Sequence, residues 1–198
     1  MANIITLSRI FLAFIAMALL FIGSKEAPNY AHISVILTVF VMWFDGLDGY
    51  IARKFHESSK LGAVLDIMGD RIVENIYWIT FCALGWINVV IPLVVVSRGI
   101  ITDSLRSLAL ADGYTAFGEK TMMQGKIAKF IVASNFSRFS YAVCKAVAFL
   151  FLILGHITYE YSHKETVLQI GVICAIVAVV FCVLRGLPVV FESKRFLK

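Results

Sequence analysis

Four aspartates lie in a strongly hydrophobic part of the sequence: Asp45, Asp48, Asp66 and Asp70. One charged residue at the centre of a membrane helix costs about 2.5–3.5 kcal/mol on insertion scales, so a cluster of four indicates a functional site. Carboxylate oxygens are hard ligands, and they bind Mg²⁺, Mn²⁺ or Ca²⁺ in preference to zinc. We therefore expect a divalent-metal site at the edge of a membrane.

The spacing of the aspartates favours two facing helices. Asp45 and Asp48 are three residues apart, and Asp66 and Asp70 are four residues apart. In a helix, each spacing places both carboxylates on one face. The connection at residues 54–60 is short, so the two helices are expected to be antiparallel neighbours. Their acidic faces would then offer four carboxylates to one or two cations.

Small residues lie on or beside the same two faces, namely Gly49, Ala52 and Gly62. They leave room for a ligand to approach the backbone or for two helices to pack closely. Arg53 follows Gly49 by one helical turn, where it could contact a phosphate. Glu74 continues the face of Asp70, where it is expected to contact Arg71 or an acceptor substrate.

The composition predicts an all-α membrane protein. The chain has 198 residues, of which 60% are hydrophobic and 16% charged, and its mean hydropathy is +0.87. A soluble domain of this size would need more polar surface. Stretches of about 20 apolar residues are long enough to cross a bilayer. We expect one membrane domain, residues 1–198, with six transmembrane helices at 4–23, 31–53, 60–84, 87–111, 125–155 and 165–186.

The distribution of basic residues predicts the orientation. Most Lys and Arg residues fall in the loops and ends on one side of the six segments, whereas the other side holds Lys25 and Lys164. By the positive-inside rule both termini are cytoplasmic, and the aspartates lie near the cytoplasmic ends of their helices. The net charge of +5 then indicates contact with anionic lipid or an anionic substrate, and no nucleic acid.

The acidic stretch resembles the signature of the CDP-alcohol phosphatidyltransferase family, D-x2-D-G-x2-A-R-x8-G-x3-D-x3-D. Every fixed position agrees. These positions are Asp45, Asp48, Gly49, Ala52, Arg53, Gly62, Asp66 and Asp70. The resemblance implies an enzyme that transfers a phosphatidyl group from CDP-diacylglycerol to an alcohol and releases CMP.

The resemblance also implies roles for these residues. Asp45, Asp48, Asp66 and Asp70 would bind Mg²⁺ or Mn²⁺ on the diphosphate, and Asp70 would also take the proton of the acceptor hydroxyl. The CDP moiety would be bordered by Gly49, Ala52, Arg53 and Gly62. Such an enzyme would be a multi-pass protein of the inner (cytoplasmic) cell membrane, in contact with membrane lipid, commonly homodimeric, and active on the cytoplasmic side.

Four further basic residues bear on the acceptor: Arg98, Arg106, Lys126 and Lys129. A converging set of Arg and Lys indicates a phosphorylated small alcohol, and Asp103 could neutralise one of the arginines. The segments around these residues are similar to phosphatidylglycerophosphate synthases, as is the opening Asn3-x-x-Thr6-x-x-Arg9. Glycerol 3-phosphate is the favoured acceptor.

Other interpretations stay open at this stage. Many such synthases have Asp-Pro-x-Ala-Asp-Lys where this chain has Asp66-Ile-Met-Gly-Asp70-Arg71, and the Asp-Arg ending is similar to inositol-phosphate transferases. Inositol phosphate or another polar alcohol is therefore an alternative acceptor. A cation transporter with the aspartates as its ion path is a distant alternative, disfavoured because the acids cluster on one side of the membrane.

Overall fold

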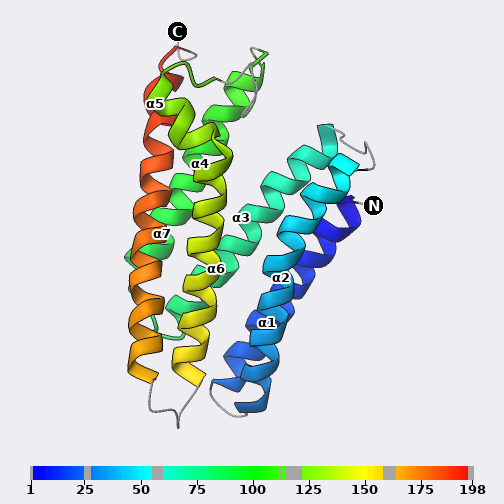
Figure 1. The fold of residues 1–198 in the computed structure, drawn as a ribbon, viewed down its shortest axis with the longest axis vertical. Helices are drawn as coiled ribbons and strands as arrows, with labels where there is room; N and C mark the ends of the chain where they lie inside the picture. Colours follow the sequence, from blue (N-terminus) through cyan, green and yellow to red (C-terminus); the bar gives the residue numbers. More distant parts are fainter. Residues whose placement is uncertain are drawn as a thin grey trace. The chain divides into compact units, whose positions relative to one another are not determined.

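The structure is a computed structural model that describes residues 2–24, 28–54, 60–111, 113–114, 122–157 and 164–195. Within these ranges every regular element is a helix, which confirms the all-α prediction (Figure 1). The elements are α1 (Ala2–Gly23), α2 (Pro28–Lys54), α3 (Lys60–Ala83), α4 (Val90–Ala111), α5 (Lys126–Ala128), the π-helix η1 (Lys129–Ala133), α6 (Asn135–Ile157) and α7 (Lys164–Ser193).

The prediction of one helix was wrong about its continuity. The segment 125–155 was predicted as one continuous helix, but it consists of α5, η1 and α6. The backbone is extended at Ser134 (φ −68°, ψ 141°), which ends the π-helix. The Ser134 Oγ accepts a hydrogen bond from the Ser137 N–H at 3.1 Å. Ser134 is therefore the N-cap that starts α6, since a serine oxygen satisfies an N–H of the first turn that has no partner within the helix.

Several helices are suited to a membrane. Among the described residues, three helical stretches are long and apolar enough to cross a bilayer: Asn3–Gly23, Asn135–Ile157 and Lys164–Ser193. A shorter apolar stretch covers Asn29–Asp45. These helices agree with a membrane protein, whereas six crossings and cytoplasmic termini stay predictions.

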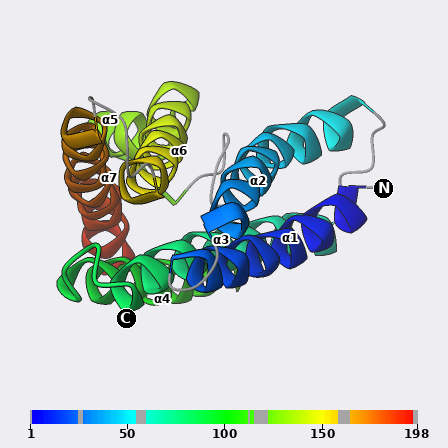
Figure 2. The same ribbon diagram turned by 90° about the horizontal axis from the view of Figure 1, so that it is seen from below.

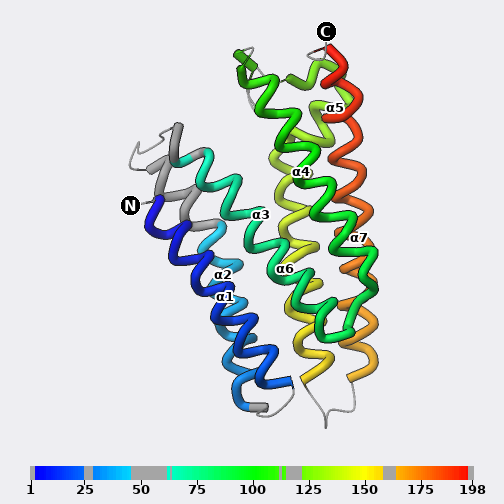
Figure 3. The backbone as a smooth tube through the Cα atoms, turned by 180° about the vertical axis from the view of Figure 1, so that it is seen from behind, coloured from blue at the N-terminus to red at the C-terminus, as the bar shows by residue number. Residues whose placement is uncertain are grey.

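The chain divides into two compact units. The first comprises Met1–Val89 and Phe149–Gly171, and the second comprises Val90–Ala148 and Val172–Lys198. In the first unit, α1 lies along α2 and α3 (Figures 1 and 3). In the second unit, α5 and the adjoining part of α6 lie beside α7 (Figure 2).

Aromatic packing fixes α3 in the first unit. Tyr77 and Trp78 of α3 are fully buried, and their rings lie 4.7 and 4.9 Å from the ring of Phe149. The Tyr77 hydroxyl donates a hydrogen bond to Thr38 Oγ1 of α2 at 3.0 Å. Burying large aromatic rings while satisfying the polar tip gives α3 one defined position against α2.

Candidate active site

The acidic residues lie on α2 and α3, which are antiparallel as predicted. Thr38 of α2 contacts Tyr77 of α3, and further along α2 the chain brings Asp45 close to Asp70. Contact positions therefore rise along one helix and fall along the other, which is the pattern of antiparallel neighbours (Figure 1). The short connection after Lys54 produces this arrangement.

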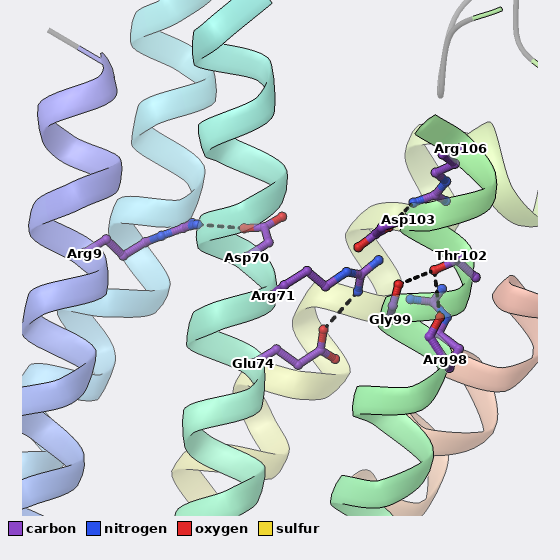
Figure 4. Close-up of polar contacts among 9 residues, drawn as sticks. All are labelled: Arg9, Asp70, Arg71, Glu74, Arg98, Gly99, Thr102, Asp103 and Arg106. Atoms are coloured by element: carbon purple, nitrogen blue, oxygen red, sulfur yellow. Dashed lines mark hydrogen bonds and ion pairs between the residues drawn. The ribbon is translucent and has the colours of Figure 1, made fainter. Parts of the chain in front are cut away.

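Arg9 of α1 joins the two acidic helices. Its Nη1 forms an ion pair with Asp45 Oδ1. Its Nη2 donates to Asp70 Oδ1 at 2.7 Å, and Figure 4 shows this second contact. The Arg9 side chain is 1% exposed, whereas the side chains of Asp45 and Asp70 are 43% and 47% exposed. The two carboxylates thus meet on a buried guanidinium and face outward on their other side.

A role for Arg9 in the site was not predicted from the sequence. It was only one residue of the Asn3-x-x-Thr6-x-x-Arg9 opening and one of many basic residues. A helix of apolar sequence that carries one arginine is nevertheless a signal, because such a charge normally has a partner.

The other acidic and small positions are described only in part. Asp66 lies one turn before Asp70 on α3 and is half-buried, as is Gly62. The side chains of residues 46–54 lie outside the described part of the structure, so Asp48, Gly49, Ala52 and Arg53 are not located there beyond their place on α2. Among the described side chains, no three His, Cys, Asp or Glu residues are grouped to hold a metal ion, and the metal site stays a prediction.

The residues that do meet are suitable ligands for a hard cation. Two carboxylates from different helices converge on one positive charge, and both are accessible from outside. Mg²⁺ is commonly bound through one or two carboxylates together with substrate phosphates, so this donor set fits the predicted metal.

Beside the acidic pair, Arg71 contacts Glu74 at 3.4 Å, and Glu74 is 2% exposed (Figure 4). The expected pairing of these two residues is confirmed. A buried carboxylate needs such a partner, because removing a charge from water is costly.

The predicted acceptor residues belong to the second unit. Arg98 of α4 packs against Gly186 of α7, where an added Cβ would lie 3.0 Å from Arg98 Cγ. The Nε of Arg98 is buried and lacks a hydrogen-bond partner among the described residues.

Arg106 contacts Asp103 at 3.3 Å, as expected for one of the arginines (Figure 4). Lys126 and Lys129 are exposed. Convergence of the four basic residues on one anion stays a prediction.

Glu192 of α7 positions the segment that carries these lysines. Its carboxylate accepts hydrogen bonds from the N–H groups of Gln124, at 2.6 Å, and Gly125, at 3.0 Å. These groups immediately precede α5, which begins at Lys126. A carboxylate at the start of a helix satisfies backbone donors that have no partner within it.

Arg185 holds the far end of the π-helix. It is 7% exposed, and it donates to Ser137 Oγ at 3.1 Å and to the Val132 carbonyl oxygen at 3.2 Å. Ser137 Oγ in turn donates to the Ile131 carbonyl at 2.6 Å. The carbonyls of Ile131 and Val132 in η1 are therefore satisfied although the helix breaks there. These roles of Arg185 and Glu192 were not predicted from the sequence.

Comparison with known families decides the assignment. The sequence model of the CDP-alcohol phosphatidyltransferase family matches residues 1–184. The chain belongs to the CDP-alcohol phosphatidyltransferase family. The match includes all four aspartates and Arg9, and it also covers Arg98, Arg106, Lys126 and Lys129.

Individual members of the family are similar over parts of the chain. A CDP-diacylglycerol–inositol 3-phosphatidyltransferase of Schizosaccharomyces pombe is 31% identical over 57% of this chain and 40% of its own length. A CDP-diacylglycerol–glycerol-3-phosphate 3-phosphatidyltransferase of Aquifex aeolicus is 30% identical over 50% and 53%. One of the same name from Pseudomonas fluorescens is 29% identical over 79% of this chain and 83% of its own length. The first two matches thus span about half or less of those relatives.

Proposed function

We propose that this phosphatidyltransferase transfers a phosphatidyl group from CDP-diacylglycerol to glycerol 3-phosphate, which yields phosphatidylglycerophosphate and CMP. The observation that carries the proposal is the meeting of Asp45 and Asp70, from two helices, within the family signature. Relatives named for transfer to glycerol 3-phosphate, including those of Aquifex aeolicus and Pseudomonas fluorescens, support the choice of acceptor.

In this proposal Asp45, Asp48, Asp66 and Asp70 would hold Mg²⁺ or Mn²⁺ on the diphosphate. When bound, the metal would neutralise the charge that develops on the leaving CMP. The acceptor oxygen forms a bond to the phosphorus of the phosphatidyl group, and the bond from that phosphorus to the bridging oxygen of CMP breaks.

Asp70 takes the proton of the acceptor hydroxyl. Its Oδ1 accepts the hydrogen bond from Arg9, which leaves Oδ2 for the hydroxyl. The hydrogen bond from the Arg9 guanidinium also limits the rotation of the carboxylate, so the base keeps one orientation.

Arg98 is the strongest candidate for the acceptor phosphate. Its Nε is buried without a hydrogen-bond partner among the described residues, and a buried N–H donor that lacks a partner gains most from an anion. Arg106 is a weaker candidate, because Asp103 already offsets its charge. Lys126 and Lys129 would add charge from α5 and η1.

One observation favours a second acceptor. The relative from Schizosaccharomyces pombe is named for transfer to inositol, and the Asp70-Arg71 pair is similar to inositol-phosphate transferases. An inositol or inositol-phosphate acceptor is the alternative. Membership of the family favours catalysis over the transport of cations.

We further propose a place and an assembly for the enzyme. The excess of Lys and Arg on one side of the helices supports an inner (cytoplasmic) membrane protein with its site on the cytoplasmic side. Nucleotide and acceptor would then arrive from water while the lipid stays in the bilayer. The family resemblance supports a homodimer.

The test is CMP release by detergent-purified protein supplied with CDP-diacylglycerol and Mg²⁺ or Mn²⁺. Glycerol 3-phosphate, inositol phosphate, inositol and serine are compared as acceptors. Release that depends on glycerol 3-phosphate is expected. Release with inositol phosphate or inositol alone would establish the alternative acceptor, and no release with any acceptor would refute the proposed reaction.

A further inference from the structure

Arg9 reaches the acidic pair from inside the protein. Its side chain is 1% exposed, whereas the carboxylates that it contacts are 43% and 47% exposed. The guanidinium is therefore buried while Asp45 and Asp70 stay accessible to a ligand. Figure 4 shows the contact of Arg9 with Asp70.

The two ion pairs use one oxygen of each carboxylate. Both Asp45 and Asp70 contact Arg9 through Oδ1, so neither of these ion pairs uses Oδ2. A planar guanidinium offers donors in a fixed fork, which is why it can hold two carboxylates at one separation.

Gly69 provides the space that this arrangement requires. A Cβ at this position would lie 2.7 Å from Thr6 Cγ2 and 3.3 Å from Arg9 Nη2. Glycine thus lets α1 pass close to α3 at the residue before Asp70. The approach brings the guanidinium within reach of both acidic helices.

The charges of Arg9, Asp45 and Asp70 affect how strongly a divalent cation can bind. Two ionised carboxylates repel each other, and one guanidinium offsets this repulsion. The three groups together then carry a net negative charge of one. A divalent cation is attracted by the carboxylates and repelled by the guanidinium, so the charge of Arg9 weakens the binding of the metal.

We propose that Arg9 is a built-in counter-ion and positioning residue of the metal site: it keeps Asp45 and Asp70 together without metal, and its positive charge weakens metal binding. This inference rests on the proposed metal-dependent function. It explains why the acidic pair is assembled around a residue that is not itself a metal ligand.

The experiment compares Mn²⁺ binding, measured by electron paramagnetic resonance, in the unaltered protein and in Arg9→Gln, Arg9→Lys and Arg195→Gln. Arg195 is exposed in the turn after α7 and controls for loss of one charge elsewhere. We expect Arg9→Gln to bind Mn²⁺ at least about tenfold more tightly, because removing a unit charge about 6 Å from a divalent ion gives this factor at the dielectric constant of water, and a buried charge is screened less. Arg9→Lys should bind like the unaltered protein, because it keeps the charge.

Thermal unfolding in EDTA supplies the second readout. Arg9→Gln should unfold about 5 °C lower than the unaltered protein, and Asp45→Asn in the same chain should restore part of this loss. Arg9→Lys should also unfold lower, since an ammonium cannot hold both carboxylates in a fork. If Arg9→Gln does not fold, Arg9→Lys tests the bridge alone: its unfolding temperature must fall.

The outcomes separate the two proposals. Equal or weaker Mn²⁺ binding by Arg9→Gln would overturn this inference and leave the proposed function standing, as would an unchanged unfolding temperature of Arg9→Lys. Absence of Mn²⁺ binding by the unaltered protein would refute the metal-dependent function itself.

Discussion

Replacing Gly69 by alanine tests the packing that brings α1 to the acidic helices. The added Cβ would lie 2.7 Å from Thr6 Cγ2, closer than carbon atoms approach in proteins, and 3.3 Å from Arg9 Nη2. Thr6 is 4% exposed and Arg9 is 1% exposed, so neither side chain can turn into solvent. Helix α1 must therefore move away from α3, or Arg9 must lose part of its contact with Asp70.

The expected cost follows from the size of the overlap. Overpacking a buried site costs typically about 1–3 kcal/mol, and a value of about 2 kcal/mol lowers the unfolding temperature of a chain of this size by about 4–8 °C. The loss should be measured by thermal unfolding of the purified protein in detergent.

The partner variant is Thr6→Ser, which removes the methyl group that Gly69→Ala would strike and keeps the hydroxyl. In a double-mutant cycle, Gly69→Ala should cost at least about 1 kcal/mol less in the Thr6→Ser background than in the unaltered protein, because residues in contact are not additive. Additive losses, or an unchanged unfolding temperature for Gly69→Ala, would show that α1 does not pack on α3 in this way.

Three more predictions concern the chemistry. Asp70→Asn should abolish CMP release while the unfolding temperature stays within a few degrees, and substantial turnover would exclude Asp70 as the base. Arg98→Gln should raise the KM for glycerol 3-phosphate at least about tenfold, since charge-assisted hydrogen bonds are worth about 1.5–3 kcal/mol. Arg106→Gln should raise this KM less, because Asp103 offsets the charge of Arg106. An equal rise for the two variants would contradict the assignment of Arg98 to the acceptor phosphate. Glu192→Gln should raise the KM for glycerol 3-phosphate and leave the KM for CDP-diacylglycerol unchanged. The reason is that it weakens the hydrogen bonds that the carboxylate accepts from two backbone N–H groups before α5. A rise in both KM values would argue against a local effect.

Contacts within one helix or between successive helices could be predicted from the sequence. The spacing of Asp45, Asp48, Asp66 and Asp70 requires only helical periodicity and a short connection, and the structure has α2 and α3 antiparallel. The ion pair of Arg71 with Glu74 joins residues one turn apart, so it also follows from periodicity.

Contacts between distant parts of the chain could not be predicted. Arg9 lies 36 residues from Asp45 and 61 from Asp70, and a basic residue near a helix end is equally consistent with contact to lipid headgroups. Glu192 lies 68 residues from Gln124. Such pairs depend on how helices pack, which periodicity does not specify.

The break at Ser134 was missed for a different reason. Serine and asparagine at positions 134 and 135 are compatible with a helix in an apolar stretch, and hydropathy alone continues through them. Whether serine caps a new helix depends on its backbone conformation and on Arg185, which satisfies the carbonyl of Val132. Arg185 belongs to α7, the C-terminal helix, which the sequence around Ser134 does not specify as a neighbour.

The central claim is a phosphatidyl transfer to glycerol 3-phosphate, and the most direct measurement is mass spectrometry of the lipid product. Purified protein is supplied with CDP-diacylglycerol, carbon-13-labelled glycerol 3-phosphate and Mg²⁺, and parallel samples contain EDTA or the Asp70→Asn variant. We predict labelled phosphatidylglycerophosphate in amounts equal to the CMP released, and none in the parallel samples. Release of CMP without labelled lipid, or labelled lipid formed in EDTA, would contradict the account.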